Sequence, residues 1–381
     1  MIRRSTSHHV EEVSLIESVA EELRELKAGL IELGYSEFQA AFGVSQYAPS
    51  YWRLFRNNAL PALRIALDFF LLNESVSALT LDLFLGKAWR CLLTLGVAQL
   101  TADDDVAMSK YSLLYCLGHL FLVDAPNKDP EVYFGDDSLA LMWHLVPMEG
   151  AKVLDVCSGS GIQALQSLSY AREVHAVEIN PRARSILVIN SYINGVGAKI
   201  KVYGGSLFES VPSGETYDLI QANPPLVPFP NDVSYPFVGH GGTDGLAITR
   251  RILEELPVRL SPKGLGQIIG LSFSDGMELI AHEEFARVAR ENELDIVLTV
   301  INHLPLFEES NSRFEALVLT AAAAAHEEVS VVRLKFRNEL FAQGATHMAP
   351  FFVLAKRGTG HLTVQNLSRP RHDGFWAVFG I

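Results

Sequence analysis

Two short apolar stretches, each followed by residues able to contact a ligand, constrain this chain more than any other feature. Lys152–Val156 leads into a glycine-rich turn, Asp155-Val-Cys-Ser-Gly-Ser-Gly161, and Glu173–Val177 ends in the acid Glu178. A strand, a glycine turn, a helix and a strand with a terminal acid follow one another when a doubly wound sheet binds a nucleotide-like molecule. The sequence therefore predicts such a site at the carboxyl edge of a sheet.

The same alternation of strands and helices continues to about residue 320 and favours an α/β fold with a mostly parallel sheet. The remaining predicted strands are Lys199–Tyr203, Leu219–Ala222, Leu265–Gly270, Ile296–Val300, Phe314–Thr320 and Phe351–Ala355. The predicted helices are Leu139–Leu145, Gly161–Tyr170, Pro181–Asn194, Gly245–Leu260 and Ser274–Glu291.

The N-terminal part has a different pattern. An apolar stripe at helical spacing predicts a helix over Val10–Leu33, ended by a glycine, and shorter helices and strands follow. These are the helices Phe38–Phe42 and Pro61–Leu72, the segment Leu79–Leu100, and the strands Val106–Tyr111 and Leu113–Val123. Helices followed by a hairpin suggest a small winged-helix-like module. Because its basic residues are few and scattered, a lid or substrate-docking role is favoured over DNA binding.

The chain length of 381 residues suggests two domains, and the best linker candidate is Asp124–Pro130, from its proline and turn residues. We therefore expect an N-terminal domain over residues 1–125 and a second domain over residues 131–381. Immediately after the linker, Val132-Tyr-Phe-Gly-Asp-Asp-Ser138 leads into a helix that Asp137 or Ser138 can cap.

Composition limits the class of protein. The formal net charge of −13 argues against a protein that coats nucleic acid through its overall field. The three cysteines are widely spaced in apolar contexts, which indicates buried free thiols and a reducing compartment. No signal peptide is evident, and the apolar run Pro61–Leu72 is too short to span a bilayer. The twelve histidines show no metal-ligand spacing. We expect a cytoplasmic protein without a bound metal and without membrane contact.

The glycine turn and the acid have a clear chemical use. Glycines at Gly159 and Gly161 let the backbone approach a ligand closely, and the helix that follows presents free N–H groups. Glu178 can accept both hydroxyls of a ribose. Each residue also fits an ordinary structural role, since Asp155 and Glu178 could cap the helices that follow them. NAD and FAD sites share such an acid, so this pair alone leaves the cofactor open.

The segment Asn223-Pro224-Pro225-Leu226 follows the strand Leu219–Ala222 and narrows the choice of cofactor. The prolines stiffen the backbone and remove N–H donors, which leaves carbonyl groups free to accept. The side-chain oxygen of Asn223 and the carbonyl of Pro224 can together accept both hydrogens of a planar –NH₂ group. Methyl transfer to that nitrogen needs in-line positioning and exclusion of water. An ordinary proline-rich loop is the alternative interpretation.

These motifs resemble those of class I S-adenosylmethionine-dependent methyltransferases of the small-domain type. That group includes release-factor glutamine N5-methyltransferases and ribosomal-RNA guanine N2-methyltransferases. The resemblance covers roughly Tyr133–Ser272. It is carried by Val153–Ala164, Val177–Pro181, Gly205–Glu209, Asp218–Leu226, and Gly241-Gly-Thr-Asp-Gly-Leu246 with Arg250 and Arg251. It implies a Rossmann-like, doubly wound, mostly parallel seven-stranded sheet beside the N-terminal, mainly helical, winged-helix-like domain.

The resemblance also implies the residues of the site, with Asn223 and Pro224 orienting the acceptor. The cofactor, S-adenosylmethionine, with S-adenosylhomocysteine as product, would contact Asp155, Cys157, Ser158, Gly159, Gly161, Glu178, Ile179, Asn180, Ser206, Leu207 and Asn223. Acceptor contacts would come from Pro225, Leu226, Phe229, Tyr235 and His240.

Three positions depart from the family pattern. Cys157 replaces a glycine, Ser206 replaces an aspartate that contacts adenine, and Leu226 replaces an aromatic that stacks on flat acceptors. Phe229 and Tyr235 are the candidate substitutes for that ring.

We therefore expect methyl transfer to an amine or amide nitrogen of a protein side chain or small metabolite. The alternatives are O- or C-methylation in secondary metabolism, N-methylation of ribosomal RNA or other nucleic acid, and a non-catalytic binding module. The acidic charge and Leu226 disfavour a nucleic-acid acceptor, and the sequence does not predict an oligomeric state.

Overall fold

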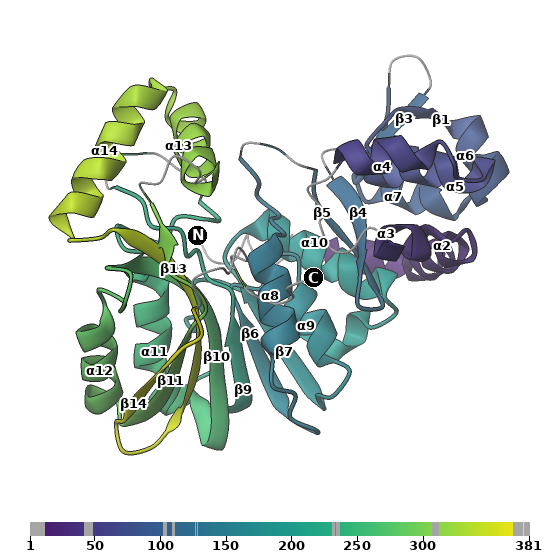
Figure 1. Cartoon of the computed structure of the whole chain (residues 1–381). Coiled ribbons are helices and arrows are strands. Elements are labelled where there is room, and N and C mark those ends of the chain that lie inside the picture. The colour runs from purple at the N-terminus through teal and green to yellow at the C-terminus, as the bar shows by residue number, and fades with distance from the viewer. Residues whose placement is uncertain are drawn as a thin grey trace, which may run out of the picture.

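The computed structural model describes residues 12–41, 49–101, 105–108, 111–125, 127, 129–230, 233, 237–306, 312–368 and 376. A large twisted sheet lies at the centre of the molecule (Figure 1). The N-terminal module lies at one end of it, and a helical hairpin, α13 (Ser312–Ala325) and α14 (Val329–Ala342), lies at the other.

The central sheet has nine strands in the described residues, in the order β14-β11-β13-β10-β9-β6-β7-β8, with β12 paired to β13. Their bounds are β6 (Lys152–Val156), β7 (Glu173–Glu178), β8 (Ile200–Gly204), β9 (Tyr217–Ala222), β10 (Leu260–Ser274), β11 (Leu294–Val300), β12 (Leu304–Pro305), β13 (His347–Arg357) and β14 (Leu362–Asn366). Strands β8, β7, β6, β9 and β10 pair in parallel, whereas β13 is antiparallel to β10 and β11. The predicted mostly parallel α/β fold is confirmed.

The strand order reverses direction between β6 and β9, because the chain runs outward from β6 to β8 and then returns. Ligands of doubly wound sheets bind at the carboxyl ends of the strands on either side of such a reversal. The seven predicted strands of the family sheet correspond to β6–β11 and β13. Strands β12 and β14 are additional, and they were not predicted because β12 has two residues and β14 is mostly exposed.

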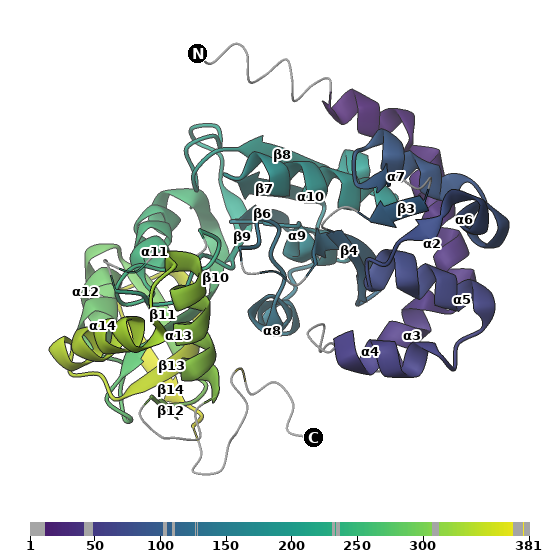
Figure 2. The ribbon, with the colours of Figure 1, turned by 90° about the horizontal axis from the view of Figure 1, so that it is seen from above.

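Helices cover both faces of this sheet, as Figure 2 shows from above. On one face, α9 (Ile162–Ser167) and α10 (Pro181–Ile193) pack through Leu165 and Leu187 against Val153 and Val174. On the other, α11 (Ala247–Arg259) and α12 (His282–Glu291) contribute Leu253, Leu256, Phe285 and Val288 to a core with Ile220 and Ile296.

Two predicted elements in the C-terminal half are wrong. Phe314–Thr320 is not a strand but part of helix α13. The buried residues Phe314, Val318 and Ala321 recur at helical spacing, and the Phe314 ring packs 5.9 Å from that of Phe336 in α14. The predicted helix Ser274–Glu291 begins only at His282, because β10 extends to Ser274 and a turn follows.

The N-terminal module contains a small antiparallel sheet in the order β1-β3-β2. Its elements are α2 (Ala20–Glu32), α3 (Tyr35–Ala41), α4 (Pro49–Arg56), α5 (Pro61–Ala66), η1 (Leu67–Leu71), β1 (Val76–Ser77), α6 (Ala78–Leu85), η2 (Ala88–Arg90), α7 (Cys91–Thr94), β2 (Ala98–Leu100) and β3 (Asp105–Met108). From β1 onward the order is strand, helices, strand and strand, which is the order of a winged helix.

The hairpin of this module is β2–β3 and not the pair of strands predicted from the sequence. Leu113–Val123 belongs to a second hairpin, β4 (Tyr111–Cys116) and β5 (His119–Asp124). Its turn residues, Leu117 and Gly118, have φ of 46° and 86°, as a two-residue hairpin turn requires. Upstream, the predicted helix Val10–Leu33 is interrupted at Val19.

The second hairpin is fastened to α10 by two asparagines. Asn190 Oδ1 accepts the Leu122 N–H at 2.7 Å, and its Nδ2 donates to the Leu122 carbonyl at 3.1 Å. Asn194 makes the equivalent pair of bonds to Leu120, at 3.1 and 2.6 Å. Apolar residues of the module and of α10 form one continuous core. The N-terminal module therefore packs directly against the sheet domain through these hydrogen bonds and the shared apolar core.

The predicted linker is tied to the structure at its first residue. Asp124 ends β5, and its Oδ2 accepts the N–H groups of Glu131 and Val132 at 2.6 and 2.9 Å. Cys91 and Cys116 are buried free thiols, as predicted, whereas Cys157 is free but only half-buried. None of the described helices combines the length and the apolar character needed to cross a membrane.

Candidate functional site

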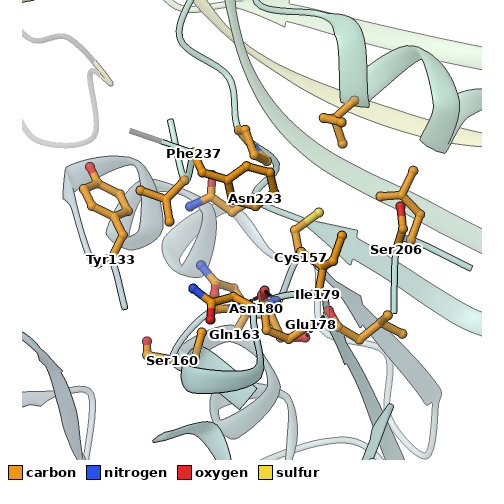
Figure 3. A pocket seen from close by; sticks show the side chains of 18 of the residues that line it. Tyr133, Cys157, Ser160, Gln163, Glu178, Ile179, Asn180, Ser206, Asn223 and Phe237 are labelled. Carbon is orange, nitrogen blue, oxygen red and sulfur yellow. Dashed lines mark hydrogen bonds between the residues drawn. The ribbon is translucent and has the colours of Figure 1, made fainter. Parts of the chain in front are cut away.

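A cavity of about 240 Å³ opens at the carboxyl ends of β6, β7 and β9, where the strand order reverses. Figure 3 shows Asn223 and Phe237 on one side of it, and Glu178 and Ile179 on the opposite side. The floor is the turn between β6 and α9, with Cys157, Ser158, Gly159 and Ser160 among the lining residues.

Glycine is required twice in this turn. Gly159 has a φ of 53° and Gly161 a φ of 84°, both in the left-handed region that other residues avoid. A Cβ atom at Gly161 would lie 2.6 Å from Cγ of Leu187, whereas one at Gly159 would meet no atom within 4 Å. Gly161 therefore permits close packing of α10 on the turn, while Gly159 leaves its open side to the cavity.

Glu178 ends β7 and closes the turn from the other side. Its Oε2 accepts the Gly159 N–H at 2.8 Å, and its Oε1 accepts the Asn180 N–H at 2.7 Å. Burial raises the pKa of this carboxyl, while the backbone donors at Asn180 and Gly159 oppose the rise. Each carboxylate oxygen keeps a further lone pair, so Glu178 can still accept hydroxyl groups from a ligand.

Asp155 lies beneath the turn and is not among the described residues that line the cavity. Its Oδ2 accepts the Ala164 N–H in the first turn of α9 at 3.1 Å. Complete burial raises the pKa of Asp155 to about 8, and the charge of Glu178 adds to the rise. Cys157 lines the cavity with a φ of 61°, a left-handed conformation that glycine adopts with less strain than other residues.

The amide of Asn223 is bonded on one side only. Its Nδ2 donates to Asp137 Oδ2 at 2.9 Å and to Ser138 Oγ at 3.2 Å. Its Oδ1 is buried and has no hydrogen-bond partner among the described residues. Asp137 and Ser138 belong to α8 (Asp136–His144), whose N-cap is Gly135, so neither occupies the N-cap position. Ser138 nevertheless contributes to capping, because its Oγ accepts the Gly135 N–H at 3.4 Å. The helix begins earlier than the sequence indicated.

Burial raises the pKa of Asp137 to about 6, and Asp136 contributes to the rise. Tyr133 donates to the other carboxylate oxygen of Asp137 at 3.0 Å. A buried polar atom without a partner costs free energy comparable to a lost hydrogen bond, and it marks a place where a ligand can supply the partner. Ser160 Oγ, also in the cavity lining, is a second such atom.

The glycines of Gly241-Gly-Thr-Asp-Gly-Leu246 hold the loop that follows Asn223. A Cβ at Gly241 would lie 2.7 Å from the Leu226 carbonyl carbon, and one at Gly245 would lie 2.7 Å from the Leu226 oxygen. Phe229, packed between Phe336 and His240, is fully buried, and its N–H donates to the Gly242 carbonyl at 2.8 Å. This close packing directs the side chains of Leu226 and Phe229 into the protein.

The cavity thus brings together most of the predicted site residues. It is lined by Cys157, Ser158, Gly159, Glu178, Ile179, Asn180, Ser206, Leu207, Asn223 and Pro225. The lining found in the described residues does not contain Asp155, Gly161, Pro224, Leu226, Phe229 or His240. Tyr235 lies outside the residues that the structure describes.

Sequence reasoning missed several lining residues. Tyr133 and Ser138 lie upstream of the first motif, Val153–Ala164. The only signal that the sequence offered around them was that of a helix cap. Phe237, with 63% of its surface exposed, supplies an aromatic ring beside Asn223, and its apolar character in a loop was the available signal. Arg251 also lines the cavity and had been noted only for its motif.

A model of the family described as "Methyltransferase small domain" matches residues 134–293. A "Putative protein N5-glutamine methyltransferase" from Methanocaldococcus jannaschii is 33% identical over 157 residues, which cover 40% of this chain and 78% of that protein. A "Ribosomal protein uL3 glutamine methyltransferase" from Bradyrhizobium diazoefficiens is 31% identical over 40% of this chain and 53% of its own length. The matched segment thus spans about half the length of the Bradyrhizobium protein.

Among solved structures, a ribosomal protein L11 methylase from Lactobacillus delbrueckii subsp. bulgaricus shows 22% identity. The match covers 42% of this chain and 67% of the L11 methylase chain, with a TM-score of 0.30. The extent of the match to the Methanocaldococcus protein, together with the small-domain match over the segment that builds the cavity, establishes the relationship. The chain belongs to the small-domain family of methyltransferases.

Proposed function

We propose that this protein transfers a methyl group from S-adenosylmethionine to the side-chain amide nitrogen of glutamine in a protein substrate. The observation that carries the proposal is the buried, unpartnered Oδ1 of Asn223 in a cavity whose opposite wall is Glu178. The two groups suit the two ligands of such an enzyme, an –NH₂ acceptor and a ribose.

The lining supports binding of the cofactor. Glu178 would accept the ribose hydroxyls, and the half-exposed Ile179 would contact the adenine together with Leu207. Ser206 would offer a hydroxyl in place of the carboxylate usual in the family. Ser160 Oγ, which is buried without a partner among the described residues, would form a hydrogen bond with the polar methionine end. The bound cofactor would supply an electrophilic methyl group on its sulfonium sulfur.

The acceptor end requires only positioning from the protein. Asn223 Oδ1 would accept one amide hydrogen and the Pro224 carbonyl the other, which orients the nitrogen lone pair. A hydroxyl acceptor has one hydrogen and would leave one of these oxygens unsatisfied. The arrangement therefore favours a nitrogen over an oxygen as the atom that accepts the methyl group. Phe237 would cover the acceptor from the side, in the role the sequence had given to Phe229 or Tyr235.

Residues outside the lining would act indirectly. Asp155 would set the start of α9 through its bond to Ala164, and Gly161 would let α10 approach the turn. His240 would brace the loop, because its Nδ1 accepts the Gly242 N–H at 3.2 Å. We retain the division into residues 1–125 and 131–381 and the cytoplasmic location as parts of this proposal.

The choice of glutamine in a protein rests on the relatives, two of which carry glutamine methyltransferase in their names. The distribution of charge favours a protein over a nucleic acid as the methyl acceptor. In the winged-helix-like module, three arginines are paired with acids, as Arg53–Glu74, Arg56–Asp68 and Arg90–Asp82. Paired arginines are poorly placed to neutralise phosphates, which dominate nucleic-acid affinity.

The test is transfer of a labelled methyl group from S-adenosylmethionine to peptides that differ at one position, Gln, Asn, Glu or Lys, with mass spectrometry to locate the label. We expect the label on Gln. Asn223→Ala should lower kcat by roughly 100-fold, because the acceptor loses its orientation, and should leave cofactor affinity largely unchanged. Asn57→Ala, at an exposed position of the N-terminal module, serves as the control. Label on Lys or Glu instead of Gln would contradict the proposed acceptor, and full activity of Asn223→Ala would contradict the proposed site.

A further inference from the structure

An asparagine side chain can present either its oxygen or its NH₂ to a ligand, because the two ends of the amide have nearly the same shape. Only one orientation suits an –NH₂ acceptor, namely the one in which Oδ1 faces the cavity. In this structure, the orientation of Asn223 follows from its partners, since its Nδ2 donates to Asp137 and Ser138.

Asp137 is well suited to enforce this choice. An ionised carboxylate can only accept hydrogen bonds, so it excludes the flipped amide, whose oxygen would then face the negative charge. Asp137 has 8% of its surface exposed, and its second oxygen accepts the Tyr133 hydroxyl at 3.0 Å. With both oxygens engaged from different segments, the carboxylate cannot rotate away from Asn223.

The backbone at Gly135 provides an independent sign that this contact is built into the fold. A Cβ atom there would lie 1.8 Å from the Tyr133 hydroxyl oxygen and 2.4 Å from Asp137 Oδ1. Any residue with a side chain at position 135 would therefore push Tyr133 and Asp137 apart. The glycine allows the chain Tyr133–Asp137–Asn223 to form.

We propose that Asp137 is a positioning residue for methyl transfer, which holds the Asn223 amide with its oxygen toward the acceptor and thereby selects acceptors that donate hydrogen bonds. The inference rests on the proposed function. Tyr133 supports Asp137, and neither residue needs to touch the reacting atoms.

This role separates Asp137 from a residue that merely stabilises the fold. A buried carboxylate is costly to desolvate, so a neutral isostere at this position keeps or raises the melting temperature. Activity moves in the opposite direction, because the isostere no longer excludes the flipped amide. Loss of kcat without loss of stability is thus the signature of positioning.

The experiment compares Asp137→Ala, Asp137→Asn and the control Asp136→Asn, which makes the same change at the neighbouring, exposed residue of α8. We expect Asp137→Ala to lower kcat by roughly 100-fold with little change in KM for S-adenosylmethionine. Asp137→Asn should recover part of that activity, because its amide oxygen can accept from Asn223, and its melting temperature should not fall. Asp136→Asn should retain kcat within about threefold.

A second readout is independent of turnover. A high-resolution crystal structure of Asp137→Ala should show the Asn223 amide flipped or in both orientations, whereas Asp136→Asn should keep the wild-type orientation. Wild-type kcat in Asp137→Ala, or an unchanged amide in its crystals, would overturn the proposal. If the wild-type protein methylates no amide, the proposed function fails, and the amide orientation still decides whether Asp137 positions Asn223.

Discussion

Glu178 and Gly159 are joined by a 2.8 Å hydrogen bond between the side-chain Oε2 of the first and the backbone N–H of the second. The acid at the end of β7 thus fixes the glycine turn that ends β6, before any ligand is considered. One carboxylate shapes the floor of the cavity and forms its wall, so a change at Glu178 affects both.

Replacement of Glu178 by alanine should weaken the binding of S-adenosylhomocysteine by at least about 100-fold, since the two proposed charge-assisted hydrogen bonds to the ribose would be lost. Calorimetric titration measures this loss. Glu178→Gln should lose less, because its amide oxygen can still accept. Glu254→Gln, at an exposed position of α11, is the matched control and should bind as wild type does. Undiminished affinity of Glu178→Ala for S-adenosylhomocysteine would contradict the proposed contact between Glu178 and the ribose.

Alanine substitutions at the two turn glycines should have different effects. Gly159→Ala points a methyl group into open space and should block the cofactor, at a folding cost of about 1–2 kcal/mol for its positive φ. Gly161→Ala forces a contact with Leu187 in addition to the same strain, so it should lower the free energy of unfolding further. Urea denaturation and cofactor titration on both variants separate the two effects. Equal stability losses would contradict the distinction.

Two phenylalanines near Asn223 should respond oppositely to truncation. Phe237 is 63% exposed, so Phe237→Ala should raise KM for the acceptor and leave the melting temperature nearly unchanged. Phe229 is fully buried, so Phe229→Ala should cost about 3–5 kcal/mol of stability. Steady-state kinetics with thermal unfolding on each variant makes the comparison. A KM effect confined to Phe229→Ala would restore the aromatic role first predicted from the sequence.

Stability should decrease as pH rises through the neutral range. Burial raises the pKa of Asp155 to about 8 from an ordinary value of 3.8, and burial raises that of Glu178 as well. The folded state therefore holds these protons more tightly than the unfolded chain, and that advantage is full at low pH and lost as pH passes the folded pKa. We expect a lower melting temperature at pH 9 than at about pH 6. Asp155→Asn should reduce this pH dependence, and an unchanged profile would contradict the assignment.

The junction between the N-terminal module and the sheet domain should depend on Asn190. Asn190→Ala leaves the N–H and carbonyl of Leu122 without their partners, so the free energy of unfolding should fall by about 2–3 kcal/mol. Asn292→Ala, which loses one bond to the Val288 carbonyl, is the matched control and should cost less. Hydrogen exchange at Leu120 and Leu122 would report local release of the hairpin. Unaltered exchange in Asn190→Ala would show that the apolar core alone holds the module.

The sequence predicted those parts of the site that strand ends and glycine turns determine. Gly159 lies in the turn after β6, Glu178 is the last residue of β7, and Asn223 directly follows β9. Parallel strands bring their carboxyl ends to one edge of the sheet. Alternation of strands and helices predicts this parallel arrangement, whereas the strand order comes from the structure.

The missed and misassigned residues depend on contacts between distant segments. Phe229 looked like an exposed ring for the acceptor, but the close approach of Gly241 and Gly245 to Leu226 turns it into the core. Tyr133 is linked to Asn223 through Asp137, and this link depends on the packing of α8 against the sheet, which no local pattern encodes.

The error at α13 has a different cause. The apolar and β-branched residues of Phe314–Thr320 favour a strand, but the helical spacing of Phe314, Val318 and Ala321, which pack in one core with α14, places them in a helix.

The most direct test of the account is calorimetric titration of the wild-type protein with S-adenosylhomocysteine, with NADH titrated in parallel. We predict micromolar binding of S-adenosylhomocysteine, about −8 kcal/mol, and no binding of NADH. Binding of NADH, or the absence of S-adenosylhomocysteine binding by the folded protein, would contradict the assignment of the cavity between Glu178 and Asn223.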